Sequence, residues 1–179
     1  MKIFWQTNRY LVREMSEQDA EGIFMLDSNK QVHKYLGEKT INTQEQALDS
    51  IKKVMEQYEY NGIGRWAIEW KANGEFVGWT GLKYEHSLWS DERYYDLGYR
   101  IRPEYWNKGI AIETARFSRN YAFNELSVKE LFGAAHVDNE GSNHILKKIG
   151  FKWDKYFFYE DLKCNWYKMS RSDFVKSML

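Results

Sequence analysis

The sequence predicts an α+β fold with a mixed sheet. Strand-like segments around a hairpin signal occupy the middle of the chain, and from Gly109 onward helical and strand-like segments alternate. The length of 179 residues suits one domain over residues 1–179, which can bury a self-sufficient core. Because the chain has one proline and no Gly/Ser-rich run, nothing in it resembles a linker between domains.

Local signals justify each element in turn. Capping boxes at Ser16 and Thr43 predict two helix starts, and Asn73-Gly74 between two apolar runs predicts a hairpin. Pro103 ends the strand that precedes it. The predicted elements, in order, are a strand at 10–13, helices at 16–27 and 43–61, strands at 66–70, 76–84 and 94–101, a helix from 109 towards 126, a strand at 131–137, a helix at 142–149, and a closing hairpin of 151–159 and 165–170.

The charge balance argues against a nucleic-acid partner. The chain carries 26 Lys plus Arg and 26 Asp plus Glu, so its formal net charge is zero. Non-specific phosphate binding depends on a positive field that this balance does not provide. An aromatic content of 17% keeps an RNA-binding module as an alternative, because single-stranded bases stack on aromatic side chains.

Metal chemistry and membrane insertion are also disfavoured. Cys164 is the single cysteine, and the four histidines show no metal-ligand spacing. No run of about 18 apolar residues occurs, and the N-terminus lacks a secretory core. We therefore expect a cytoplasmic protein without a metal.

The segment 94–122 carries the strongest chemical signal. A strand ends in a turn, and Gly109 stands where the next helix begins. Unpaired amides of a first helical turn bind anions, and a glycine lets a phosphate approach the backbone closely. Lys108 adds a positive charge. Taken alone this pattern also fits an ordinary turn, and neither G-x-x-x-x-G-K-[ST] nor G-x-G-x-x-G is present.

Two motifs at this point resemble those of the GNAT N-acetyltransferases. The first is the loop that holds the cofactor pyrophosphate in that family, and the second opens with Asn139 and Ser142 and closes with Gly150-Phe151. Further stretches are similar to the branch of ribosomal-protein N-terminal Ala/Ser acetyltransferases, so that the resemblance covers nearly the whole chain. These stretches are Asn8–Arg13, Asp19-Ala20, Tyr35–Gly37, Phe76–Gly78 and Leu97–Tyr99.

The resemblance implies acetyl-CoA as cofactor and a GNAT fold. In that fold a mostly antiparallel sheet splays between the fourth and fifth predicted strands, with helices on both faces. The backbone of Tyr99, Arg100 and Ile101 would hold the pantetheine arm, and Asn139 would bond it. The pyrophosphate loop corresponds to Trp106, Asn107, Lys108, Gly109, Ile110 and Ala111.

The expected catalytic residues depart from the family pattern. Many members place a tyrosine seven residues beyond the asparagine, where this chain has Leu146. Ser142 is then the candidate acid, and a helix N-cap is the alternative role for it. Asp96 is the candidate base, with Glu85 and the Glu160-Asp161 turn as competitors.

The acceptor is expected to be a primary amine. The branch resemblance favours a protein N-terminal α-amine, with a small-molecule amine second. Trp66, Trp79 and Trp89 are candidates for the acceptor pocket, although core packing is the more common role of an aromatic strand residue. The other walls would come from 30–60, the loop 85–93 and the closing hairpin. A catalytically silent acyl-CoA-binding module is the rival function, and a homodimer is compatible with the aromatic-rich composition.

Overall fold

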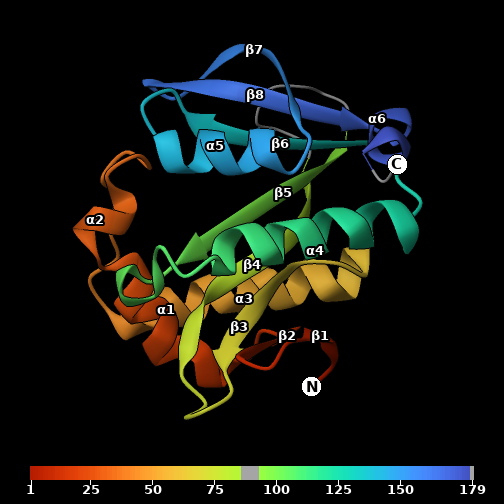
Figure 1. Ribbon diagram of the computed structural model, residues 1–179. Coiled ribbons are helices and arrows are strands. Elements are labelled where there is room, and N and C mark those ends of the chain that lie inside the picture. Colours follow the sequence, from red (N-terminus) through yellow and green to blue (C-terminus); the bar gives the residue numbers. More distant parts are fainter. Residues whose placement is uncertain (86–92, 178–179) are drawn as a thin grey trace.

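The computed structural model describes residues 1–85 and 93–177. In this part of the chain eight strands form one sheet in the order β1-β2-β3-β4-β5-β6-β8-β7 (Figure 1), and only β5 and β6 pair in parallel. The predicted α+β fold with a mixed, mostly antiparallel sheet is therefore confirmed. The bounds are β1 Ile3–Gln6, β2 Tyr10–Glu14, α1 Ala20–Asp27, α2 Lys30–His33, α3 Gln44–Asn61, β3 Arg65–Trp70, β4 Phe76–Glu85, β5 Tyr94–Ile101, α4 Ile110–Asn124, β6 Glu130–His136, α5 Glu140–Lys148, β7 Lys152–Tyr159, β8 Leu162–Ser170 and α6 Arg171–Lys176.

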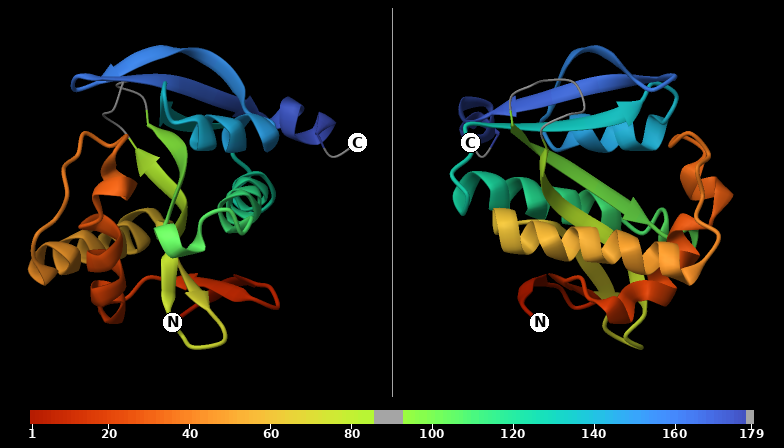
Figure 2. Two further views of the ribbon diagram at one scale, coloured as in Figure 1. Left: turned by 60° about the vertical axis from the view of Figure 1, so that its left-hand side comes forward. Right: turned by 180° about the vertical axis from the view of Figure 1, so that it is seen from behind.

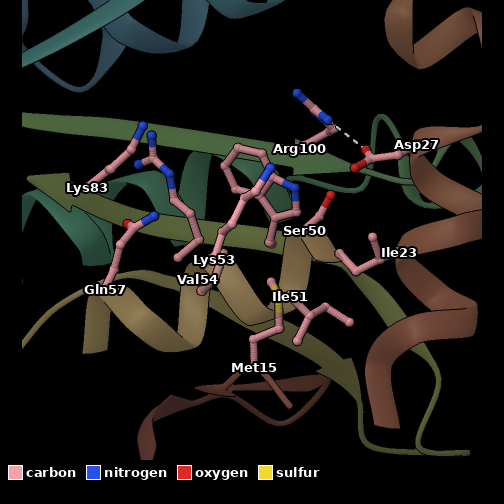
Figure 3. Close-up of a pocket in the computed structure, with 12 residues that line it drawn as sticks. Met15, Ile23, Asp27, Ser50, Ile51, Lys53, Val54, Gln57, Lys83 and Arg100 are labelled. Atoms are coloured by element: carbon pink, nitrogen blue, oxygen red, sulfur yellow. Dashed lines mark hydrogen bonds and ion pairs between the residues drawn. The ribbon is translucent and has the colours of Figure 1, made fainter. Parts of the chain in front are cut away.

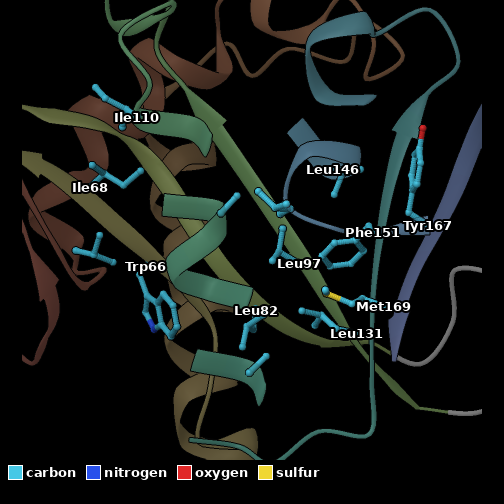
Figure 4. Close-up of a cluster of buried hydrophobic side chains, with 14 of the residues drawn as sticks. Trp66, Ile68, Leu82, Leu97, Ile110, Leu131, Leu146, Phe151, Tyr167 and Met169 are labelled. Carbon is cyan, nitrogen blue, oxygen red and sulfur yellow. The ribbon is translucent and has the colours of Figure 1, made fainter. Parts of the chain in front are cut away.

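Helices cover both faces of the sheet. Figure 2 shows α1 and α3 on one face of the central strands and α4 on the opposite face. The larger core cluster lies on the α4 side and includes Trp66, Leu97, Ile110 and Leu146 (Figure 4). A smaller cluster, which includes Ile51, packs α1 and α3 against the other face. Burial of these apolar side chains on both faces is what holds the helices to the sheet.

The local signals produce the elements that they predict. The Thr43 side chain caps α3 by accepting from the Gln46 amide at 3.4 Å, and Gly62 ends this helix in the left-handed region with φ of +66°. The turn after β3 places Gly74 at φ of +73°, a conformation that glycine adopts without steric cost. These signals act within four or five residues, which is why the sequence alone reveals them.

Several short elements were not predicted. Strand β1 and helix α2 span four residues each, too few to show a period, and α6 spans six. Of the three tryptophans considered for an acceptor pocket, Trp66 has the core role that was favoured for an aromatic strand residue, because its side chain is fully buried on the α4 side. Trp89 lies outside the described residues, as do His86 and most of the loop 85–93.

Candidate active site

The sheet opens between β5 and β6. These strands share one register pair, Asp96 with Phe132, whereas β4 and β5 pair from Gly78–Ile101 to Glu85–Tyr94. Figure 1 shows β5 turning away from β6 beyond this point. The edge of β5 from Leu97 to Ile101 that faces β6 therefore has no ladder partner among the described strands. Backbone N–H and C=O groups on such an edge are available to an extended molecule.

The turn after β5 presents backbone amides at the start of α4. Asn107 and Gly109 adopt left-handed conformations with φ of +59° and +77°. Gly109 is the N-cap residue of α4, and no side chain caps this helix end. First-turn amides without a side-chain cap and the positive end of the helix dipole are features that favour an anion at this position.

The hairpin of β1 and β2 supports this turn from behind. Arg9 Nη1 donates to the Lys108 carbonyl oxygen at 2.9 Å, and Arg9 Nη2 contacts both carboxylate oxygens of Glu113 at 2.9–3.0 Å. The Tyr10 hydroxyl donates to Glu113 Oε2 at 2.6 Å. Glu113 thus anchors the turn to the N-terminal hairpin, a role that the sequence did not indicate because about 100 residues separate these segments.

Trp106 ties the same turn to the end of β5. Its indole Nε1 donates to the Ile101 carbonyl oxygen at 2.7 Å, while the side chain stays 42% exposed. Lys108 Nζ lies 5.0 Å from the centroid of the Tyr105 ring. Trp106 therefore has a structural role that does not need a ligand.

Helix α5 begins earlier than predicted, and Ser142 is not its N-cap. Asn139 caps the helix, its Oδ1 accepting from the Ser142 amide at 3.1 Å. This leaves the Ser142 hydroxyl 3.0 Å from the Tyr99 hydroxyl, which also donates to the Ser142 carbonyl oxygen at 3.2 Å. Burial raises the pKa of Tyr99, so its hydroxyl stays protonated at neutral pH.

Leu146 occupies the position where many family members carry a tyrosine. Its side chain is 1% exposed and packs in the core on the α4 side. The Tyr99 hydroxyl reaches Ser142 of α5 from β5, and the Tyr167 hydroxyl donates to Asn143 Oδ1 of the same helix from β8. The chain thus supplies a tyrosine to the first turn of α5 from a neighbouring strand.

Three of the carboxylates considered as a base, Asp96, Glu85 and Glu160, pair with a cation. Asp96 Oδ2 accepts from Arg65, which also donates to the carbonyl oxygens of Gly81 and Asp96 at 2.6 and 2.9 Å. Burial raises the pKa of Asp96, and the Arg65 guanidinium opposes this effect. Glu85 accepts from Lys83, and exposed Glu160 pairs with Lys39 at 2.5 Å.

A cavity of about 240 Å³ lies between the face of β4 and β5 and the helices α1 and α3 (Figure 3). Trp79 and Arg100 line it from the sheet, and Ile51 and Gln57 line it from α3. Adjacent residues of a strand point to opposite faces. Arg100 therefore faces this cavity while its neighbour Tyr99 faces α5, so the two sites are adjacent on β5.

The segment after α2 meets the closing hairpin near the end of β6. The Tyr35 ring stacks on His136 with centroids 5.7 Å apart, and Lys39 pairs with Glu160 in the β7–β8 turn. This brings together two of the predicted acceptor walls, although residues of the hairpin do not line the cavity.

The charged side chains that line the cavity were not singled out from the sequence, among them Asp27, Arg65 and Arg100. Arg100 Nη1 donates to Asp27 Oδ1 at 2.6 Å, and Arg65 reaches the cavity from β3. From the sequence, Asp27 was only the predicted end of a helix, and Arg100 was expected to contact the cofactor only through its backbone. No local pattern could have found them, because 73 residues separate Arg100 from Asp27.

Within residues 1–85 and 93–177, no three His, Cys, Asp or Glu side chains come together in a way that could hold a metal ion. The helices in this part of the chain include none that is both long and apolar enough to cross a membrane.

Comparisons with known proteins agree with this geometry. The family described as an acetyltransferase (GNAT) domain matches residues 9–152. The chain belongs to the GNAT acetyltransferase family. It is an acetyl-CoA-dependent N-acetyltransferase, and the left-handed turn, the uncapped α4 and the opening beside β5 fit that cofactor.

Several known proteins resemble this GNAT enzyme, and the acceptors that two of their names give are different. It is 34% identical over 147 residues to YoaA, an uncharacterised N-acetyltransferase of Bacillus subtilis, with 82% of this chain and 81% of the relative covered. It is 27% identical over 141 residues to the spermidine N(1)-acetyltransferase of Escherichia coli, with 78% of this chain and 71% of the relative covered. The ribosomal-protein-S5-alanine acetyltransferase of Vibrio fischeri has the same fold, with a TM-score of 0.77, 15% identity and coverage of 97% and 99%.

Proposed function

We propose that this enzyme transfers the acetyl group to a primary amine by direct attack of the amine on the thioester. The observation that carries the proposal is the opening between β5 and β6, which ends at the uncapped start of α4. When bound, acetyl-CoA supplies an activated acyl group, and the chain supplies binding, orientation and proton transfer.

The cofactor contacts are mostly backbone contacts. The unpaired edge at Tyr99, Arg100 and Ile101 would hold the pantetheine arm as a neighbouring strand would. The Asn139 Oδ1 is used by the cap of α5, which leaves its Nδ2 to bond the arm. The turn would hold the pyrophosphate through the residues Trp106, Asn107, Lys108, Gly109, Ile110 and Ala111.

Ser142 is the proposed acid for the departing thiolate, and Tyr99 assists it. Their hydroxyls are 3.0 Å apart, so either can donate to the other while one of them donates to the sulfur. The raised pKa of Tyr99 keeps this pair protonated at neutral pH.

Asp96 is the proposed base. Burial raises its pKa in the direction that a base at neutral pH needs, and its ion pair with Arg65 fixes its position. An α-amine has an ordinary pKa near 8, so it needs little deprotonation.

The acceptor that we favour is the α-amine of a protein N-terminus, with a small-molecule amine as the second choice. The branch resemblance and the likeness to an alanine acetyltransferase of a ribosomal protein support the first, and the spermidine acetyltransferase supports the second. An alternative function is acyl-CoA binding without turnover, which Leu146 and the ion-paired carboxylates favour.

Calorimetric titration with acetyl-CoA and an assay of thiol release across a panel of amines test both functions. Micromolar binding with turnover on at least one amine supports the transferase. Binding without thiol release on peptides, polyamines, aminoglycosides and amino acids supports the silent module, and the absence of binding contradicts both.

A further inference from the structure

The cavity beneath β4 and β5 is lined by basic side chains. Lys53, Arg65, Lys83 and Arg100 line it, and Asp27 is the single carboxylate among its described lining residues. Three of these cations are ion-paired, and Lys53 is the unpaired one among the described lining residues, so the cavity keeps a net positive charge that favours anions over cations.

The acidic groups around the cavity are already engaged. Asp27 accepts from Arg100 at 2.6 Å and lies 3.5 Å from His33 Nε2. Asp96 and Glu85 lie behind the lining and pair with Arg65 and Lys83. An acceptor with several ammonium groups would have to displace these ion pairs.

The aromatic face in the cavity is also occupied by cations. The Arg65 and Arg100 guanidinium groups lie 5.3 and 5.2 Å from the ring centroid of Trp79. An aromatic ring that is free could bind an ammonium group by a cation–π contact. In this cavity that contact is made by the chain itself, so Trp79 does not select a cationic acceptor.

Other polar groups at the cavity are unused among the described residues. Lys53 is exposed on α3 and makes no ion pair there, and Arg100 uses only Nη1 in a side-chain hydrogen bond. Gln57 Oε1 is buried and has no hydrogen-bond partner. A buried acceptor without a partner costs free energy, which a bound N–H group would recover.

We propose that the acceptor carries a carboxylate next to its amine, with Lys53 and Arg100 binding the carboxylate and Gln57 Oε1 accepting from the amine. The cavity volume of about 240 Å³ suits a free amino acid or the first residues of an acidic peptide. This inference rests on the proposed function and narrows its acceptor.

The same charges assist the reaction. Positive groups close to an ammonium lower its pKa and favour the neutral amine that attacks the thioester. A carboxylate on the acceptor brings the molecule into this positive region, where its amine loses a proton more readily. A polyamine gains no such attraction, so the inference separates this enzyme from its spermidine-acetylating relative.

The test compares acceptors that differ in one charge. The assay measures kcat/KM for free amino acids against their carboxamides, for Ser-Glu and Ala-Glu tetrapeptide amides against their Gln counterparts, and for spermidine. We expect the carboxylate member of at least one pair to be preferred by about tenfold, equivalent to about 1.4 kcal/mol. The pair with the larger ratio of kcat/KM values shows whether the acceptor is a free amino acid or an acidic peptide. Equal values, or a preference for the amide, Gln or spermidine member, would overturn the inference.

A charge reversal with a matched control assigns the effect to the cavity. Lys53→Glu places a negative charge at the cavity, whereas Lys52→Glu changes the net charge equally at an exposed residue of α3 that does not line it. We expect Lys53→Glu to lower kcat/KM for the carboxylate acceptor about tenfold, mainly through KM, and to raise it for spermidine. An equal effect of the two variants would contradict the inference.

A binding measurement distinguishes failure of the proposed function from failure of this inference. If acetyl-CoA binds but no amine is acetylated, the transferase proposal fails, and N-acetyl-L-glutamate and spermidine are titrated against the protein by calorimetry. Tighter binding of N-acetyl-L-glutamate, weakened by Lys53→Glu and not by Lys52→Glu, supports the carboxylate site. Tighter binding of spermidine, or no binding of either, overturns it.

Discussion

The Tyr99 hydroxyl lies 3.0 Å from Ser142 Oγ and joins strand β5 to the first turn of α5. Tyr99 and Ser142 are both half-buried, so the pair lies between the core and the opening beside β5. This contact gives each hydroxyl a donor or acceptor and suggests that the two act as one unit.

Removal of either hydroxyl should slow turnover. General-acid catalysis contributes about 10²-fold or more, so we expect Tyr99→Phe and Ser142→Ala each to lower kcat by about 10- to 100-fold with little change in the Kd of acetyl-CoA. The double variant should lose little more than the worse single variant, because the hydroxyls share one task. Thiol-release kinetics measure this, and losses that multiply would show independent roles.

Gly109→Ala should weaken cofactor binding. A φ of +77° strains any residue with a Cβ by about 1 kcal/mol, so the turn should shift away from its anion-binding conformation. Gly74→Ala is the matched control, because Gly74 has φ of +73° in the distant β3–β4 turn. We expect both variants to unfold at lower temperature and only Gly109→Ala to raise the Kd of acetyl-CoA in calorimetry. Equal affinities would mean that the turn does not contact the cofactor.

Arg9→Gln should loosen the turn without touching the cofactor. It removes the bond to the Lys108 carbonyl and the ion pair with Glu113, both partly exposed. Partly exposed pairs contribute about 0.2–1 kcal/mol, so the Kd of acetyl-CoA should rise about two- to fivefold. Lys39→Gln removes another exposed ion pair, between the segment after α2 and the β7–β8 turn, and should leave this Kd unchanged. A change in kcat at saturating cofactor would point to a different role for Arg9.

Asp96→Asn should distinguish a catalytic role of Asp96 from a structural one. Loss of the carboxylate leaves the largely buried Arg65 side chain without its ion-pair partner, so the melting temperature should fall. If Asp96 is the base, the acidic limb of the kcat/KM pH profile also disappears, since its titration produces that limb. A profile that keeps its acidic limb in a folded variant would leave only the structural role.

Asp27 should make the stability of the protein depend on pH. Burial opposes ionisation, but the nearby His33 imidazole and the Arg100 guanidinium outweigh it and lower the pKa of Asp27 below its ordinary 3.8. The stabilisation is then complete above about pH 4 and is lost as pH falls through the lowered pKa. Asp27→Asn should lower the free energy of unfolding at pH 7. As the pH falls, the variant should lose less of this free energy than the unsubstituted protein does. Urea unfolding from pH 7 to pH 2, with Asp49→Asn on the exposed side of α3 as control, measures both effects.

Much of the fold could be predicted because its signals are local. A capping box, Asn73-Gly74 and Pro103 each act on the next few residues, and the elements that they predict occur where expected. The turn at Gly109 was predicted in the same way. Elements of four residues, such as β1 and α2, were missed because they are too short to show a period and are stabilised by their neighbours.

Sequence alone determined the fold class, the turn that presents its amides at the start of α4 and the family to which the chain belongs. Tertiary structure decided which side chains meet: Tyr99 with Ser142, Arg65 with Asp96, and Arg100 with Asp27 and Trp79. It also decided that Trp66 packs in the core and that Trp79 lines the cavity. The physical reason is range, because capping and turn formation act between near neighbours, whereas ion pairs and cavities form between segments that only the folded sheet brings together.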